Sequence, residues 1–150
     1  MEKEVIKEYA ARIAQASKTE LVVITYEIIN NYIEDAMECY KNQNLEGFRF
    51  NIKKAKQFVN DLQANLDFNY KLSFELMSLY LYINKCLVSS SIRKSTENLP
   101  VCQRIIASLK NAFSQVAKTD KRGGAMPNSE QIYAGLTYGK SSMLNEVYIR

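Results

Sequence analysis

The stretch that decides the fold is NLEGFRFNIKKAKQFVNDLQANL, residues 44–66. Apolar residues recur in it at alternating steps of three and four: Leu45, Phe48, Ile52, Ala55, Val59, Leu62 and Leu66. This spacing is typical of an α-helix packed in a left-handed bundle. The residue before the stripe, Asn44, is a good N-cap, because its side chain can accept a hydrogen bond from an unpaired backbone N–H of the first turn. We therefore expect a bundle helix to start at this asparagine.

Three more helices are expected around this one. Ser17 and Glu20 form a capping box that opens a helix running to about Asn42. A helix from about Tyr70 to Ile92 has its core stripe at Leu72, Leu76, Leu79, Ile83 and Cys86. A last helix has Pro100 near its first turn, where a missing N–H is harmless, and a stripe at Cys102, Ile105, Leu109, Ala112 and Val116. Four helices with short connections predict an all-α fold, an antiparallel four-helix bundle.

The two ends of the chain differ from the middle. Residues 2–16 have apolar groups at helical spacing and predict a short N-terminal helical segment. Four of the five glycines and Pro127 fall in residues 123–150, which predicts an irregular tail. We expect a helical-bundle domain over 1–122 and a glycine-containing C-terminal extension over 123–150.

Composition argues against an enzyme. The chain has no histidine, and its three cysteines form no CxxC motif, so a His-containing triad, a His-ligated metal site and a zinc ribbon are not expected. Glu27, Glu34 and Glu38 lie on the polar face of their helix, where no bundle metal site would form. We expect no catalytic residues, no metal and no cofactor, and we expect the cysteines to pack as small apolar groups.

Charge and hydropathy bear on partners and location. The formal net charge is +4, and the nearest thing to a basic cluster is Lys53, Lys54 and Lys56, which we interpret as a solvated helix face rather than a nucleic-acid site. The longest early aliphatic run, residues 21–24, is far shorter than a membrane span, and the N-terminus is too charged for a signal peptide. These features predict a reduced, cytoplasmic protein without stable membrane insertion.

Two helices carry more apolar surface than a bundle core requires. Apolar residues fill about half of the helix over 18–42. The helix over 70–92 has a second stripe opposite its core stripe, at Phe74, Met77, Leu81 and Val88. Either the chain's own ends cover these faces, or a partner helix does. Tyrosines suit partner-facing positions, because the ring buries well while its hydroxyl stays hydrated. The candidate binding residues are Val22, Tyr26, Ile29, Ile33, Phe74, Met77, Tyr80 and Leu81.

From about residue 9 to 117 the sequence resembles the FliS family of flagellin-specific export chaperones. The resemblance rests on the order of several short motifs: Tyr9, Ala16-Ser17 followed by Glu20-Leu21, Thr25-Tyr26-Glu27, Lys54-Ala55, Leu62, Leu66-Asp67 and Leu79-Tyr80-Leu81-Tyr82. The tail from Ser129 resembles an extension carried by some clostridial members.

This resemblance implies an antiparallel helical bundle that binds the disordered C-terminal segment of flagellin in the cytoplasm. Binding would prevent premature polymerisation until the complex reaches the flagellar export gate. The alternative from the residues alone is a non-catalytic bundle subunit whose extra apolar faces form a permanent oligomer, such as a homodimer. Tyr9 and Ile13, and apolar residues of the tail, are expected to cover the client groove in the free protein; a tail that lies elsewhere is the competing expectation.

Overall fold

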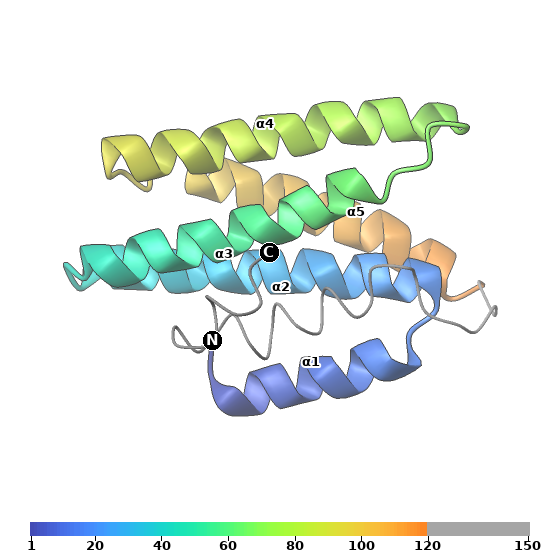
Figure 1. Cartoon of the computed structure of the whole chain (residues 1–150), viewed down its shortest axis with the longest axis horizontal. Coiled ribbons are helices and arrows are strands. Elements are labelled where there is room, and N and C mark those ends of the chain that lie inside the picture. Colours follow the sequence, from blue (N-terminus) through green and yellow to red (C-terminus); the bar gives the residue numbers. More distant parts are fainter. Residues whose placement is uncertain (120–150) are drawn as a thin grey trace. The chain divides into compact units, whose positions relative to one another are not determined.

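The computed structural model describes residues 1–119, and every regular element in that range is an α-helix. Five helices are present: α1 (Lys3–Gln15), α2 (Lys18–Lys41), α3 (Leu45–Ala64), α4 (Lys71–Arg93) and α5 (Leu99–Ala117) (Figure 1). The prediction of an all-α helical bundle is confirmed, and the expected helix limits agree with the observed ones within a few residues. The tail predicted for 123–150 lies outside the described residues.

The described residues form two compact units. One comprises Met1–Thr25 and residues 110–119, and holds α1, the start of α2 and the end of α5. We call it the N-terminal unit. The other, Tyr26–Leu109, holds the rest of α2 and α5 and all of α3 and α4. We call this four-helix part the bundle unit.

Side chains fix the helix starts as the sequence predicts. Ser17 and Glu20 form a reciprocal capping box: each backbone N–H donates to the other residue's side chain at 3.2 Å. At the start of α3, the Asn44 Oδ1 accepts from the backbone N–H of Gly47 at 2.9 Å. A Cβ atom at Gly47 would lie 2.8 Å from the Cys39 Sγ and 2.5 Å from the Asn44 Nδ2. A side chain at this position would therefore require Cys39 and Asn44 to shift.

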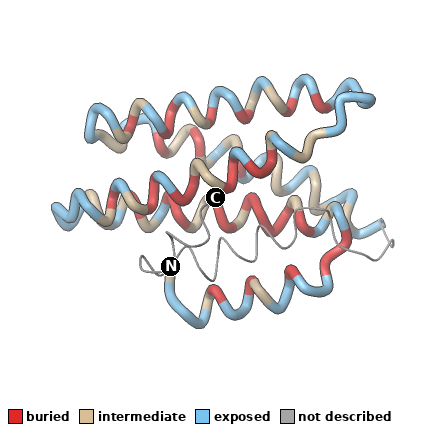
Figure 2. The backbone as a smooth tube through the Cα atoms, viewed as in Figure 1, coloured by how far each residue is buried: buried red, intermediate tan, exposed pale blue. Residues whose placement is uncertain are grey.

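Within the bundle unit, α2 contacts each of the other three helices. The Tyr32 ring stacks on Phe58 of α3, with ring centroids 5.9 Å apart. The Tyr26 hydroxyl lies 2.6 Å from the Tyr80 hydroxyl of α4. The Asn30 Nδ2 donates to a backbone carbonyl of α5 at 3.3 Å. Helix α2 is therefore the central helix of this unit, and its long buried segment is visible in Figure 2.

The core face of α4 is rotated by one residue from the predicted stripe. The buried positions are Ser73, Leu76, Tyr80, Ile83, Leu87 and Ser90, with Cys86 beside them. Of the predicted stripe, Leu76, Ile83 and Cys86 are buried, but Leu72 is exposed and Leu79 is only half-buried. The Ser73 Oγ donates to the Asp67 carbonyl at 2.6 Å, which turns this serine inward. The prediction that Leu72 and Leu79 are core residues is therefore wrong, and Ser73 and Tyr80 are buried in their place.

The predicted stripes of α3 and α5 hold in part. In α3 the stripe is buried from Phe48 to Leu62, and only its end positions are more open. In α5 the buried residues are Leu99, Cys102 and Ile106. The expectation that Ala112 and Val116 are core residues is wrong, because both are exposed.

Lys54 is buried, which corrects the interpretation of the basic cluster as a fully solvated face. Its Nζ lies 5.9 Å from the centre of the Tyr32 ring and 5.8 Å from that of Phe58, a cation–π arrangement. Asp61, two turns further along α3, is also buried. Burial raises the pKa of its carboxyl to about 6 from the ordinary 3.8, against the opposing effect of the Lys54 charge.

A pH-dependent stability follows from Asp61. Between about pH 4 and 6 the folded protein binds more protons at this carboxyl than the unfolded chain does. Its contribution to the free energy of unfolding therefore falls as the pH rises through this window. Urea unfolding across this range should show the stability of Asp61→Asn relative to wild type increasing with pH. Parallel pH profiles for the two proteins would contradict the assignment.

Candidate functional site

A strip of apolar residues lies on α4, on the face away from its buried residues. It consists of Phe74, Met77, Leu81, Val88 and Ile92 and is called the α4 strip below. Phe74, Leu81 and Ile92 are 60%, 56% and 75% exposed, and Met77 is half-buried. The steps between these residues are three, four, seven and four, so they share one helix face over about 27 Å at 1.5 Å per residue.

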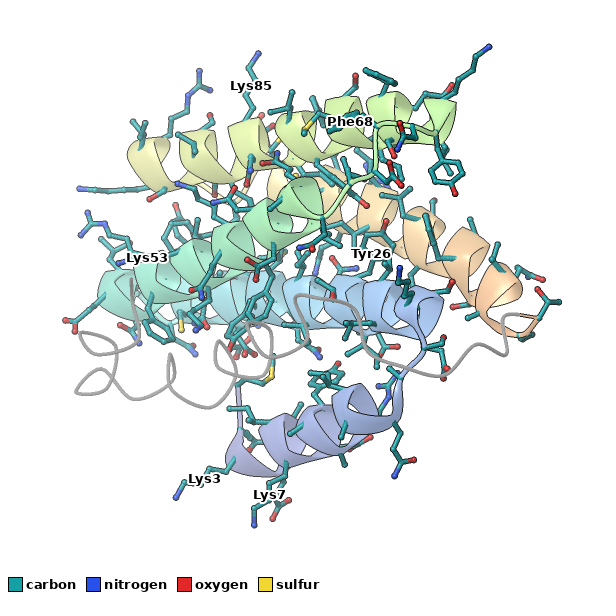
Figure 3. All side chains as sticks on the ribbon, turned by 45° about the vertical axis from the view of Figure 1, so that its right-hand side comes forward. Lys3, Lys7, Tyr26, Lys53, Phe68 and Lys85 are labelled. Carbon is teal, nitrogen blue, oxygen red and sulfur yellow. The ribbon has the colours of Figure 1, made fainter. Side chains whose placement is uncertain are left out.

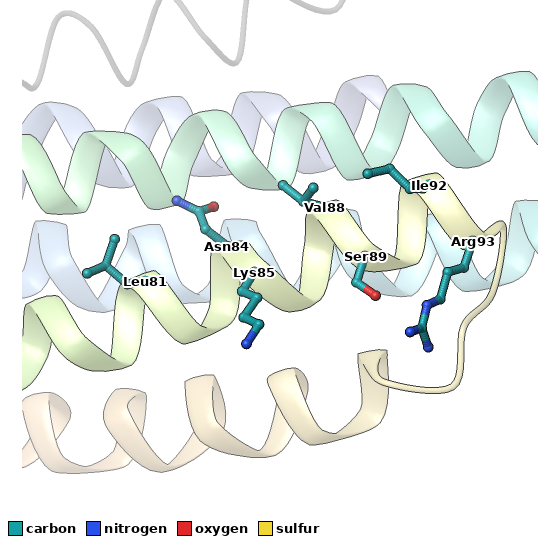
Figure 4. A pocket seen from close by; sticks show the side chains of 7 residues that line it. All are labelled: Leu81, Asn84, Lys85, Val88, Ser89, Ile92 and Arg93. Carbon is teal, nitrogen blue, oxygen red and sulfur yellow. The ribbon is translucent and has the colours of Figure 1, made fainter.

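The C-terminal half of the strip borders a shallow depression with a volume of about 480 Å³. Leu81, Val88 and Ile92 project from one side of α4, and Lys85 and Arg93 follow one edge of the depression (Figure 4). The remaining lining residues are Asn84 and Ser89. All of these residues belong to α4, so the depression is open to a partner along the length of the helix.

Aromatic side chains extend the strip at the N-terminal end of α4. Phe68, in the connection between α3 and α4, packs on Phe74 with ring centroids 5.0 Å apart. Tyr70 and Leu72 next to them are 66% and 52% exposed. An exposed apolar surface of this extent in a folded domain is typical of an interaction site.

On α2 the predicted surface is wrong for three of four residues. Tyr26, Ile29 and Ile33 are at most 1% exposed, and Val22 is half-buried. The reason is the central position of α2: three helices pack around it within the bundle unit, so its wide apolar face is core. The width of the apolar face correctly indicated additional contacts, but these are internal.

Tyr80 is also buried and does not present a hydrated hydroxyl. Its ring centroid lies 6.4 Å from that of Tyr26, and the two hydroxyls share the 2.6 Å hydrogen bond. Burial raises the pKa of Tyr80 to about 12, and raises that of Tyr26 further. Figure 3 shows Tyr26 among the helices, whereas Lys85 points away from them. The tyrosine pair therefore joins α2 to α4 in the core of the bundle unit.

The two N-terminal residues assigned to a groove cover are buried. Tyr9 is 6% and Ile13 is 3% exposed, both on the inward face of α1 in the N-terminal unit. The Arg12 guanidinium lies 5.5 Å from the centre of the Tyr9 ring. Their burial is what a helix with one apolar face requires.

Two parts of the exposed surface were not among the predicted site residues. Ile92 lies one turn after Val88, so extending the second stripe by four residues would have found it. The aromatic group around Phe68 was missed for a different reason. It depends on a loop and on the rotation of the first turn of α4, which the Ser73–Asp67 hydrogen bond determines and which helical periodicity does not encode.

The burial pattern predicts effects of very different size for two alanine substitutions. Ile29→Ala should lower the free energy of unfolding by about 2–5 kcal/mol, because it leaves a cavity in the core. Leu81→Ala should change it by no more than about 0.5 kcal/mol, because the side chain is exposed. Denaturant unfolding of both variants measures this difference. Equal losses would show that the α4 strip is buried in solution.

Among residues 1–119, no three or more Cys, Asp and Glu side chains are grouped so that they could hold a metal ion. The helices in this part of the chain are also too short or too polar to cross a membrane.

Comparison with known proteins agrees with this architecture. The family described as "Flagellar protein FliS" matches residues 1–120. The flagellar secretion chaperone FliS of Bacillus subtilis (strain 168) is 23% identical over 107 residues, which cover 71% of this chain and 80% of the relative. The family match spans the N-terminal helix, the whole bundle unit and the α4 strip. The chain belongs to the FliS family of flagellar proteins.

Proposed function

We propose that this protein is a cytoplasmic export chaperone that binds the C-terminal segment of flagellin along the α4 strip. It keeps that segment from polymerising and delivers it to the flagellar export gate, without catalysis or a cofactor. The observation that carries the proposal is the exposed apolar face of α4, opposite the core, in a chain of the FliS family.

The geometry of the strip favours a helical ligand. Its anchors recur at the spacing with which two packed helices meet, and they extend over about five helical turns. A disordered client segment with a matching apolar face can fold against it as a helix. The apolar area buried then offsets the entropy lost on ordering the client.

Seven of the eight candidate residues divide into two roles under this proposal, and the half-buried Val22 stays a predicted client contact. Phe74, Met77 and Leu81 contact the client directly. Tyr26 and Tyr80 hold α2 against α4 through the hydrogen bond between their hydroxyls, and Ile29 and Ile33 support α2 from within the core. Release requires no chemistry, since a competing contact at the export gate is sufficient to displace a reversibly bound helix.

A charged substitution in the middle of the strip should weaken client binding. Leu81→Asp is expected to reduce the affinity for the flagellin C-terminal segment by about 2 kcal/mol or more, as for a central interface anchor. Isothermal titration calorimetry gives the affinity, and the negative heat-capacity change of wild-type binding reports apolar burial.

Leu45→Asp is the matched control. Leu45 is an exposed leucine in the same unit, and a carboxylate suits the first turn of α3. The control should bind flagellin as wild type does. Equal affinity of Leu81→Asp and wild type, with both folded, would place the client elsewhere, and no binding by folded wild-type protein would refute the function.

The chain ends supply a further expected outcome. If Tyr9, Ile13 or the tail cover the client groove in the free protein, removal of the cover should tighten flagellin binding, because a closed state lowers the apparent affinity. Deletion of residues 123–150 tests the tail, and Tyr9→Ala tests α1. Unchanged affinity and oligomeric state after the deletion would exclude the tail as a cover.

A further inference from the structure

The α4 strip lies in a strongly basic part of the chain. Residues 76–119 contain six basic side chains, Lys85, Arg93, Lys94, Arg104, Lys110 and Lys118, and a single carboxylate, Glu97. On α4 itself no acidic residue follows Glu75. The net charge of +4 is therefore not spread evenly along the sequence, and α4 itself carries Lys85 and Arg93 after its last carboxylate.

One edge of the strip is formed by α4 itself. Lys85 and Arg93 line the depression together with Leu81, Val88 and Ile92 (Figure 4). Both basic side chains are exposed. They are eight residues apart, so their charges recur along the same edge after about two helical turns.

The opposite edge is formed by α3. The Asn84 Nδ2 donates to the Asn60 Oδ1 at 2.9 Å, which fixes the register of the two helices. Lys53, Lys56 and Asn60 are spaced three and four residues apart and share a face of α3. α3 and α4 are consecutive and antiparallel, so residues that precede Asn60 on α3 lie opposite residues that follow Asn84 on α4. Lys53 and Lys56 therefore lie at the level of Val88 and Ile92. The strip thus has basic residues along both of its edges, Lys85 and Arg93 on one and Lys53 and Lys56 on the other.

We propose that the C-terminal half of the α4 strip selects an acidic amphipathic helix. Its apolar residues would contact Leu81, Val88 and Ile92, and its flanking carboxylates would face Lys85 and Arg93 on one side and Lys53 and Lys56 on the other. This inference rests on the proposed function, in that the flagellin segment docking here is the acidic helix. Charge complementarity of this kind determines the register of the partner and accelerates its association.

The same charges argue against other occupants. A second copy of this chain docked strip to strip would bring two sets of like charges together, which is unfavourable. Residues 120–150 carry four basic and three acidic side chains, so the chain's own C-terminal segment is not acidic. Nucleic acid is disfavoured because the C-terminal half of the strip is aliphatic, and the residues that line the depression offer no aromatic stacking surface.

Two stapled helical peptides with identical leucine anchors test the selection, one with glutamates and one with lysines at the flanking positions. Wild-type protein should bind the glutamate peptide about tenfold or more tightly than the lysine peptide, as measured by fluorescence anisotropy. The double variant Lys85→Glu/Arg93→Glu should lose or reverse this preference. Raising the ionic strength from about 0.05 M to about 0.5 M should reduce it in the wild type.

Lys3→Glu/Lys7→Glu is the matched control, because it changes the net charge equally at two exposed positions of α1. It should keep the wild-type preference. Equal binding of both peptides, or a preference that survives the Lys85/Arg93 reversal, would overturn the inference even if the flagellin segment binds. Failure of the flagellin segment to bind, with the glutamate preference intact, would refute the proposed function and leave the acidic-helix site standing.

Discussion

The architecture of the bundle unit depends on the burial of α2. Tyr32, Tyr26 and Asn30 contact α3, α4 and α5 in turn, and residues along α2 such as Ile28 and Ile33 are completely buried. A helix packed from three sides must be apolar over a wide arc, because every polar group there would need an internal partner. The Tyr26–Tyr80 hydrogen bond satisfies two hydroxyls at once and fixes α4 on this central helix.

Once α2 is buried, α4 is left at an edge of the bundle unit with only one face covered. Its buried face follows a regular alternation of three and four residues from Ser73 to Ser90, whereas Phe74, Leu81 and Ile92 remain exposed. A stable domain would not need these apolar side chains at the surface. Their regular helical spacing and the basic residues on both sides are the features that favour a helical partner.

Local signals made most of the fold predictable from sequence. The Ser17–Glu20 capping box, Asn44 and the stripe in α3 have a direct physical meaning, and each appears as expected. The second apolar stripe on α4 was also visible in the sequence. It indicated an additional contact surface, since one core cannot account for two apolar faces on the same helix. What periodicity could not reveal is which helix is central. The apolar faces of α2 and α4 look alike in sequence, and only tertiary packing decides that Ile29 is buried while Leu81 is exposed.

The central claim is that the client contacts α4 and not α2. Methyl NMR of isoleucine-, leucine- and valine-labelled protein, titrated with the flagellin C-terminal segment, tests it directly because both helices carry methyl groups in known environments. The account predicts the largest shift changes at Leu81, Val88 and Ile92, with smaller ones at the buried Ile29 and Ile33. Large changes confined to α2, with the α4 methyl signals unmoved at saturation, would contradict it.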